Sequence, residues 1–271
     1  MNIYSYSKLE TFEKCPLKYK FRYIDKLEPE IKQTIEAFLG KKVHETLEWV
    51  YINAYTRKIE LDDIVEFYAK KWREDFNEEI KIVRDEFSEE HYFNKGIRFL
   101  VDYFLKHSPF KDNTIATEQK IKIDLDKEGK YKLIGFIDRL VHHKETNVFE
   151  IHDYKTGSFK SQEELDSDRQ LALYSIGVRN LFDNVTDVNL VWHFLDLNKE
   201  MVSKRTPEQL VELKKEIMGV INKIENSTEF PPNPSCLCNW CEFKGYCNQA
   251  KREVCYRESP EYEKNNYYNE D

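Results

Sequence analysis

Two acids and a lysine are the side chains of this chain best placed to do chemistry. Asp153 and Lys155 lie two positions apart in segment 149–157, whose alternating character predicts a strand that ends near Gly157. Side chains two apart on a strand point to the same face, so a carboxylate and an ammonium share one face. A second acid, Asp138, lies upstream on another strand-like run. Two acids and a lysine on paired strands can hold a divalent metal and a water molecule beside a phosphate, which is the minimal equipment of a metal-dependent nuclease.

The ligand atoms of these residues indicate which metal they would hold. Carboxylate oxygens suit the hard cations Mg²⁺ and Mn²⁺, so Asp138 and Asp153 are the expected ligands. The carbonyl of Tyr154 would complete the site from the same strand. Lys155 would orient or help deprotonate the attacking water and offset developing negative charge. Gly157 is expected to let the chain turn sharply after the strand.

Two residues from other segments are further candidates for this site. His44 lies on an expected helix and could bind a metal through a neutral imidazole, although a lone helical histidine is more often structural. Glu118, which enters the first expected strand, could also join the site. The alternative for Glu118 is an exposed acid at the end of a strand.

A glutamine and a tyrosine on the next expected helix complete the candidate site. Gln170 and Tyr174 are four residues apart, which places both on one helix face. If that face points inward, the two side chains could hold Lys155 or a DNA phosphate. The alternative is that Tyr174 is an ordinary core residue and Gln170 a surface residue.

The cysteines are unevenly placed, with five of the six between positions 236 and 255. In a reducing cytoplasm, clustered cysteines more often bind metal than form disulfides. Cys238, Cys241 and Cys247 form a compact set of three thiolates, and a closed zinc site or an iron–sulfur cubane needs a fourth. Cys15 is the only distant cysteine, and it would close the site by joining the two ends of the chain.

Two further cysteines and the choice of metal remain open at this point. Cys236 is a rival ligand, but it is too close to Cys238 for easy simultaneous binding. Cys255 is interpreted as a spare thiol. Spacing alone does not distinguish zinc from iron–sulfur.

Composition limits the classes of protein to which the chain can belong. Its 271 residues suffice for one large domain or a domain with an elaboration. It has no run of 18 apolar residues and no recognisable signal peptide, so we expect a cytoplasmic protein without a membrane partner. The net charge of −8 does not indicate nucleic-acid binding, which needs only a local basic groove. One candidate basic patch, or alternatively a solvated helix face, consists of Lys14, Lys18, Lys20 and Arg22.

The order of the expected elements indicates an α/β protein. Apolar spacing predicts a short helix at about 8–15 and an alternating stretch at about 19–27. Three long helical stretches precede three strands with alternating side chains, and a helix, a strand with a short partner near Val202, and a last helix starting at Thr206 follow. We therefore expect a core sheet with an N-terminal helical insertion packed beside it. The expected ranges are about 33–56, 61–83 and 88–106 for the first helices, 115–125, 131–142 and 147–155 for the strands, and 163–180, 188–195 and 206–226 for the last elements.

Taken together, the motifs resemble those of RecB-type nucleases of the PD-(D/E)XK superfamily. They occur in that family's order and span almost the whole chain. One departure is Ile137, where the superfamily's name implies a proline before the first acid, but RecB-type members commonly carry Gly-x-x-Asp here. The matching motifs are the N-terminal segment 4–9 with Cys15 and Pro16, segment 40–48 with His44, segment 135–139 with Asp138, segment 153–157, Gln170 with Tyr174, and Cys238, Cys241 and Cys247.

The resemblance implies a fold, a cofactor and a domain organisation. The fold is a restriction-endonuclease-like central mixed sheet flanked by helices. In the family the four cysteines hold a 4Fe–4S cluster, as in AddB and the CRISPR-associated RecB-like exonucleases, and here this cluster would pin the C-terminal segment to the N-terminal helix. Residues 1–271 would form a single nuclease domain, divided into a helical insertion at 28–110, a catalytic core at 111–226, a cysteine-rich segment at 227–258 joined to Cys15, and a tail at 259–271.

The expected function is a Mg²⁺- or Mn²⁺-dependent DNA nuclease that hydrolyses phosphodiester bonds, with single-stranded or free DNA ends as substrate. As an exonuclease it would serve DNA repair, recombination or phage DNA processing. Since the chain has no Gly-rich phosphate loop, it would need a separate helicase or recombination protein as partner. One alternative is a CRISPR adaptation nuclease that trims DNA before spacer integration. Another is a non-catalytic DNA-binding or scaffold protein with a structural zinc site made of four cysteines.

Overall fold

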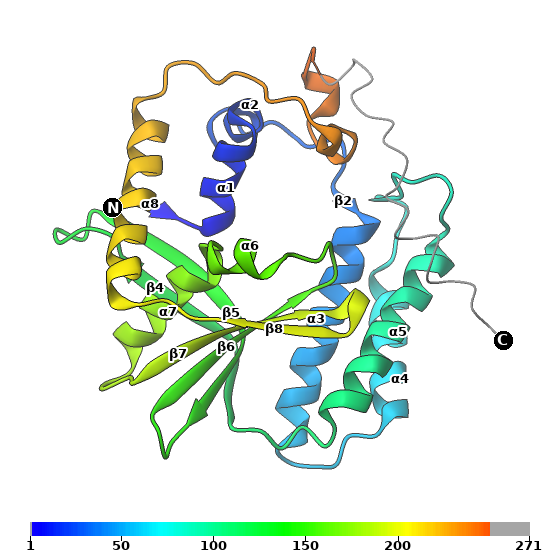
Figure 1. Cartoon of the computed structure of the whole chain (residues 1–271). Helices are drawn as coiled ribbons and strands as arrows, with labels where there is room; N and C mark the ends of the chain where they lie inside the picture. Colours follow the sequence, from blue (N-terminus) through cyan, green and yellow to red (C-terminus); the bar gives the residue numbers. More distant parts are fainter. Residues whose placement is uncertain (1, 250–271) are drawn as a thin grey trace.

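A long central strand, β5 (Tyr131–His143), organises the sheet of this protein (Figure 1). The computed structural model describes residues 2–249. Antiparallel β4 (Thr114–Asp124) pairs along most of β5. The first part of β5 also pairs in parallel with β1 (Asn2–Tyr4), and its second part pairs antiparallel with β6 (Val148–Lys155).

The sheet continues beyond β6 with one parallel and one antiparallel strand. β7 (Asp187–Phe194) runs parallel to β6, and β8 (Lys199–Ser203) returns antiparallel to β7. A parallel pair needs a long crossover connection, which here consists of α6 (Gln162–Asp166) and α7 (Gln170–Leu181). The result is a central mixed sheet flanked by helices, as the sequence predicts.

Helices cover the two faces of this sheet and create two hydrophobic cores. Helix α7, α8 (Pro207–Asn226) and α1 (Tyr6–Lys14) contribute to the first core together with the inward side chains of the strands. On the other side, α3 (Ile35–Ala54), α4 (Leu61–Asp75) and α5 (Glu89–His107) surround a second, aromatic-rich core. Tyr154 of β6 belongs to this second core, so the helical segment packs directly on the sheet (Figure 1).

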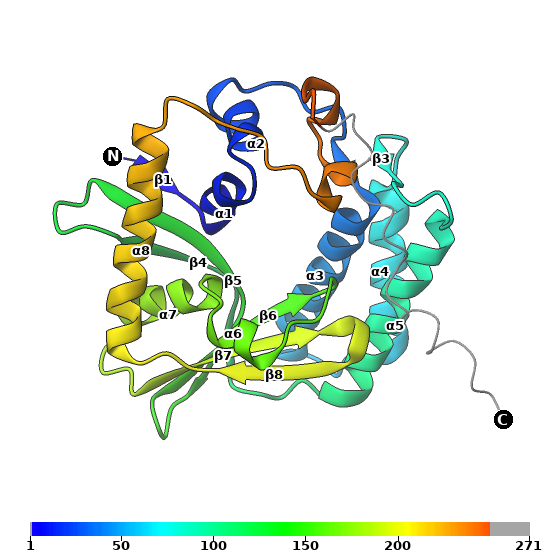
Figure 2. The ribbon, with the colours of Figure 1, turned by 45° about the horizontal axis from the view of Figure 1, so that its top comes forward.

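The cysteine-rich segment lies against the N-terminal helices, as both views show (Figures 1 and 2). The amide of Leu17 donates to the carbonyl of Pro231 over 3.3 Å, and the side chain of Asn233 donates to the carbonyl of Lys14 over 2.9 Å. These bonds hold α2 (Pro16–Tyr19) beside a segment more than 200 positions later. Two short 3₁₀ turns, η3 (Cys236–Trp240) and η4 (Lys244–Tyr246), shape the segment.

Local sequence signals explain several helix boundaries. At the start of α8, the hydroxyl of Thr206 accepts from the amide of Gln209, and the Gln209 side chain accepts from the amide of Thr206 over 2.8 Å. This reciprocal pair, with Pro207 in the first turn, is the capping box that the sequence predicts.

Three expectations about the elements are wrong, and one strand was missed. The helix predicted at 163–180 is interrupted between α6 and α7, because Asp168 accepts from the amide of Gln170 and starts a new helix there. The stretch at about 19–27, in which we expected alternation, is helical. It consists of the end of α2 and a π-helical turn at Lys20–Ile24, and the ring centroids of Tyr19 and Tyr23 lie 5.0 Å apart. Helix α4 ends at Asp75, eight residues before the predicted end, and β3 (Ile80–Lys81) then pairs with β2 (Gln33–Thr34). Strand β1 was not predicted, because three residues are too few to show alternation.

In the described part of the chain, no helix is both long and apolar enough to cross a membrane.

Candidate active site and cysteine pocket

The two predicted acids lie on neighbouring strands, Asp138 in the middle of β5 and Asp153 near the end of β6. Asp138 of β5 accepts a hydrogen bond from the amide of Tyr154 through Oδ2, over 2.9 Å. The end of β6 is therefore held by a side chain of β5 rather than by its backbone. Asp153 is almost fully buried, with 7% of its side chain exposed. The two carboxylates interact, since the charge of Asp153 raises the pKa of Asp138.

His44 of α3 reaches this pair of strands and its tautomer follows from its contacts. Its Nε2 lies 2.8 Å from the carbonyl oxygen of Tyr154, which can only accept, so Nε2 carries the proton. In the neutral ring, Nδ1 is then an acceptor, and it faces Oδ2 of Asp138 at 3.3 Å. Two acceptors at this distance need a cation or a proton between them. The donor set therefore fits a divalent metal.

Glu118 extends this arrangement from β4. Ligand atoms of Glu118, His44 and Asp138 all lie within 4.8 Å of one another. Residues on both sides of Glu118 pair with the neighbours of Asp138, so the two acids face each other across the β4–β5 ladder. The backbone of Glu118 is left-handed, with φ of 47°, which is rare for a residue with a side chain. Such strain is common at functional sites.

Burial strongly perturbs the pKa of Asp138. Burial raises this pKa to about 7, with Asp153 adding to the effect and His44 and the Tyr154 amide opposing it. A nearby metal ion would stabilise the ionised form of this carboxylate, which burial disfavours. This is the electrostatic setting expected of a metal ligand.

Lys155 connects the acids to α7. Its ammonium lies 2.7 Å from Oδ2 of Asp153 and donates to the side-chain oxygen of Gln170 over 3.3 Å. Gln170 in turn donates to the hydroxyl of Tyr174 over 3.4 Å. Burial opposes the charge on Lys155, but Asp153 outweighs it, so the pKa of this lysine is raised. Lys155 therefore remains an ammonium and is suited to stabilising negative charge rather than to accepting a proton.

Two glycines near the site, Gly135 and Gly40, permit close packing, and a third, Gly157, lies where the chain bends after β6. A Cβ at Gly135 would collide with the ring of Tyr174, so this glycine makes room for the ring on β5. A Cβ at Gly40 of α3 would lie 3.1 Å from the hydroxyl of Thr156, after β6. The chain bends at Gly157 just after β6, as expected, although its backbone is not left-handed and a Cβ there would meet no atom within 4 Å.

One acid near the site was missed by the sequence interpretation. Glu48 lies one turn after His44 on α3, and its charge adds to burial in raising the pKa of Glu118. The four-residue spacing from His44 places both side chains on one helix face, which is the signal that would have identified it. We call His44, Asp138, Asp153 and Lys155 the acidic centre.

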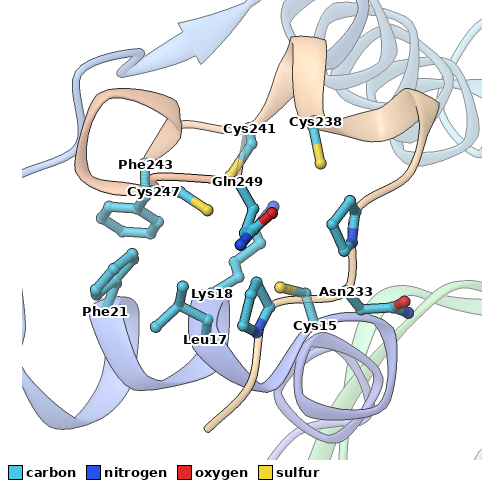
Figure 3. Close-up of a pocket in the computed structure, with 12 residues that line it drawn as sticks. Cys15, Leu17, Lys18, Phe21, Asn233, Cys238, Cys241, Phe243, Cys247 and Gln249 are labelled. Carbon is cyan, nitrogen blue, oxygen red and sulfur yellow. The ribbon is translucent and has the colours of Figure 1, made fainter. Parts of the chain in front are cut away.

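The four cysteines predicted as ligands line a single pocket, and their side chains point into it (Figure 3). The pocket encloses about 350 Å³, including its opening to solvent, and Phe21 and Phe243 are among its walls. Burial is the main reason that the pKa of the Cys241 thiol is raised, and Cys15 adds to it. We call this the cysteine pocket; its cysteines are Cys15, Cys238, Cys241 and Cys247.

The other two cysteines have different positions. Cys236 is not among the residues that line the cysteine pocket. Cys255 lies outside the described residues.

The predicted basic patch is neutralised by acids of this chain. Lys18 lies 2.9 Å from a carboxylate oxygen of Glu242, and Arg22 pairs with the other oxygen. Lys14 and Lys20 pair with Glu10 and Asp25. Since Glu242 lies between Cys241 and Phe243, these charges hold the cysteine-rich segment in place rather than forming a free basic groove.

Comparison with known proteins identifies a family for this chain. A family model described as the PD-(D/E)XK nuclease superfamily matches residues 3–248. A crystal structure of a candidate exonuclease from Eubacterium rectale is similar with 12% identity and a TM-score of 0.47, covering 94% of this chain and 90% of that one. The structure of the protein named SSO0001 is similar with 15% identity and a TM-score of 0.37, covering 90% and 93%. No curated protein matches the chain.

Proposed function

The chain belongs to the PD-(D/E)XK nuclease superfamily, and from this premise we propose that it is a metal-dependent deoxyribonuclease that hydrolyses phosphodiester bonds. One observation carries the proposal. The acidic centre gathers two carboxylates, an imidazole and an ammonium from α3, β5 and β6, with contacts between them of 2.7 to 3.3 Å. This is the donor set and the positive charge that phosphodiester hydrolysis needs.

We propose that Asp138, Asp153 and His44 hold a Mg²⁺ or Mn²⁺ ion. The Tyr154 carbonyl would be a further ligand, because its oxygen has a second lone pair besides the one used by His44. Glu118 is close enough to join. When bound, such an ion would polarise a phosphate oxygen and lower the pKa of a water molecule.

The chain's own groups would supply orientation and charge. The Lys155 ammonium, fixed between Asp153 and Gln170, would lie beside the phosphate and offset the negative charge that develops on its oxygens. Tyr174 would keep Gln170 in place through its hydroxyl. Because the pKa of Lys155 is raised, we assign this residue charge stabilisation and not deprotonation of water.

We further propose that the protein is of the RecB type and carries a 4Fe–4S cluster on Cys15, Cys238, Cys241 and Cys247. The spacing of the thiols supports this choice over zinc. A single zinc ion holds four sulfurs about 3.8 Å apart, given bonds of about 2.3 Å. Among the described residues, the cysteines form no group of three whose sulfurs all lie within 4.8 Å. A cubane places several iron atoms between the sulfurs and suits this wider pocket.

We propose that the substrate is DNA with single-stranded ends. The protein would degrade it as an exonuclease in repair, recombination or phage DNA metabolism. The proposed division keeps 111–226 as the catalytic core, 28–110 as the helical insertion, and 227–258 as a segment tied to Cys15. A separate helicase would supply unwound strands.

The test is digestion of an end-labelled single strand by anaerobically purified protein, with Mg²⁺, Mn²⁺ or EDTA. We expect shortened products with either metal, none with EDTA, and none with Asp153→Asn in any condition. Absence of cleavage by the wild-type protein with both metals would contradict the proposal. Equal cleavage by the variant would contradict the assignment of the acidic centre.

A further inference from the structure

A second group of candidate metal ligands lies beside the second core. His193 of β7 is the register partner of Tyr154, whose ring belongs to the second core and contacts the rings of both His44 and His193. His107, the last residue of α5, and Glu200 of β8 approach His193 from two sides. Their ligand atoms all lie within 4.8 Å of one another, and both histidines line a small hollow with Asn198 and Lys199.

A chain of buried hydrogen bonds fixes the tautomer of His193. The guanidinium of Arg139 lies 2.8 Å from Nδ1 of His152, and a guanidinium can only donate. Nδ1 of His152 is therefore an acceptor. The same atom lies 2.8 Å from Nε2 of His193, which must donate to it. In neutral His193 the proton is thus on Nε2, and Nδ1 is a bare acceptor.

That bare nitrogen faces a carboxylate. Nδ1 of His193 lies 3.5 Å from Oε2 of Glu200, which also has no proton to donate when ionised. Two acceptors that face each other need a proton or a metal ion between them.

We propose that His107, His193 and Glu200 bind a zinc-class transition-metal ion. Tetrahedral zinc with bonds of about 2.0–2.1 Å keeps its ligand atoms roughly 3.4 Å apart, close to the 3.5 Å between His193 and Glu200. Imidazole ligands favour zinc over magnesium. His152 would orient His193 through the second ring nitrogen, as partners of metal-bound histidines usually do. We call these three ligands the histidine site.

Three cations, Arg139, Lys106 and Lys199, surround this site together with the Glu200 carboxylate. The nearest buried cation, Arg139, is paired with Asp112 and also donates to the hydroxyl of Tyr154. The ammonium of Lys199 lies over the ring of Phe159. Glu200 is exposed, so water can reach the site and fill the fourth position. The ion would tie the end of α5 to the β7–β8 hairpin.

Cobalt(II) is the probe for this site, because it replaces zinc and its colour reports the ligands. We would measure Co²⁺ binding by equilibrium dialysis and visible absorption with the full chain, its cysteine pocket loaded, and with Glu200→Gln, His107→Gln and a control, Glu216→Gln. Glu200 and Glu216 are both exposed, so neither substitution threatens the fold.

The expected result is a loss of at least about 10-fold in affinity for one Co²⁺ in each of the two ligand variants. The visible absorption of tetrahedral Co²⁺ with nitrogen and oxygen ligands, which has no sulfur charge-transfer band, should also disappear in these two variants. The control should bind as the wild type does, and Zn²⁺ should raise the melting temperature of the wild type and the control more than that of Glu200→Gln. Equal Co²⁺ affinity and absorption in Glu200→Gln, His107→Gln and the control would overturn the proposal, and so would an equal Zn²⁺ shift in melting temperature.

Discussion

The acidic centre draws its two acids from neighbouring strands, whereas the cysteine pocket draws its thiols from segments more than 200 residues apart. Backbone pairing between β5 and β6 extends to Arg139 and His152, next to Asp138 and Asp153, and it would remain if the Asp153 carboxylate were removed. The cysteine pocket has no strand pairing of this kind. Short turns, hydrogen bonds such as Asn233 to Lys14, and the ion pairs of Glu242 with Lys18 and Arg22 hold its two sides together.

This difference between the acidic centre and the cysteine pocket indicates which substitutions should affect activity without affecting stability. In the acidic centre, loss of the Asp153 or Lys155 side chain removes charge and leaves the strand pairing intact. In the cysteine pocket, a lost thiol would remove a link between distant segments. The four predictions below test this contrast, from the largest expected effect to the smallest.

Asp153→Asn should abolish cleavage while leaving the fold intact. A bound metal ion supplies several kcal/mol of charge stabilisation, and about 4 kcal/mol corresponds to roughly a 10³-fold loss in rate. The melting temperature should change little, because the relief of repulsion with Asp138 opposes the loss of the carboxylate that pairs with the buried Lys155 ammonium. Single-turnover cleavage and thermal unfolding measure the two effects, with exposed Asp183→Asn as the control. A variant that is destabilised but keeps its cleavage rate per folded molecule would show that Asp153 serves stability rather than activity.

Lys155→Ala should lower kcat by about 10²–10³-fold, the usual cost of removing one preorganised charge donor. Lys155→Arg should recover part of this loss, because it keeps the positive charge beside Asp153. A guanidinium cannot act as a base at neutral pH. If the arginine variant were as inactive as the alanine variant across the pH range, deprotonation of water would be the better assignment.

Cys241→Ser should lower stability by about 3 kcal/mol, which for a chain of this size is a fall in melting temperature of roughly 6–12 °C. The brown colour of an iron–sulfur protein should be lost at the same time. Cys236→Ser is the matched control, because Cys236 does not line the pocket. Equal colour and melting temperature in both variants would show that the thiols do not act as a link.

Gly135→Ala should cost about 2 kcal/mol, since the new methyl group meets the Tyr174 ring and overpacking typically costs about 1–3 kcal/mol. The penalty should largely vanish in a Tyr174→Ala background. Urea unfolding of the two single variants and the double variant gives the coupling energy directly. A penalty that is the same in both backgrounds would mean that the ring does not cause it.

Local patterns in the sequence were sufficient for much of the fold and for most of the residues that meet in the candidate site. The alternation in 115–155 predicted β4, β5 and β6 within a few residues. The predicted helix at 163–180 failed because one side chain, Asp168, can cap a new helix as well as extend an old one.

The sequence by itself determined which groups carry charge and which strands present them, because strand periodicity fixes the face of each side chain. It thereby placed Asp153 with Lys155, and the four-residue spacing placed Gln170 with Tyr174. Only the tertiary structure decided that His44 bonds the Tyr154 carbonyl, that Glu48 approaches Glu118, and that His107 and His193 meet Glu200. These contacts join segments whose separation along the chain carries no local signal, so they depend on how whole helices pack on the sheet.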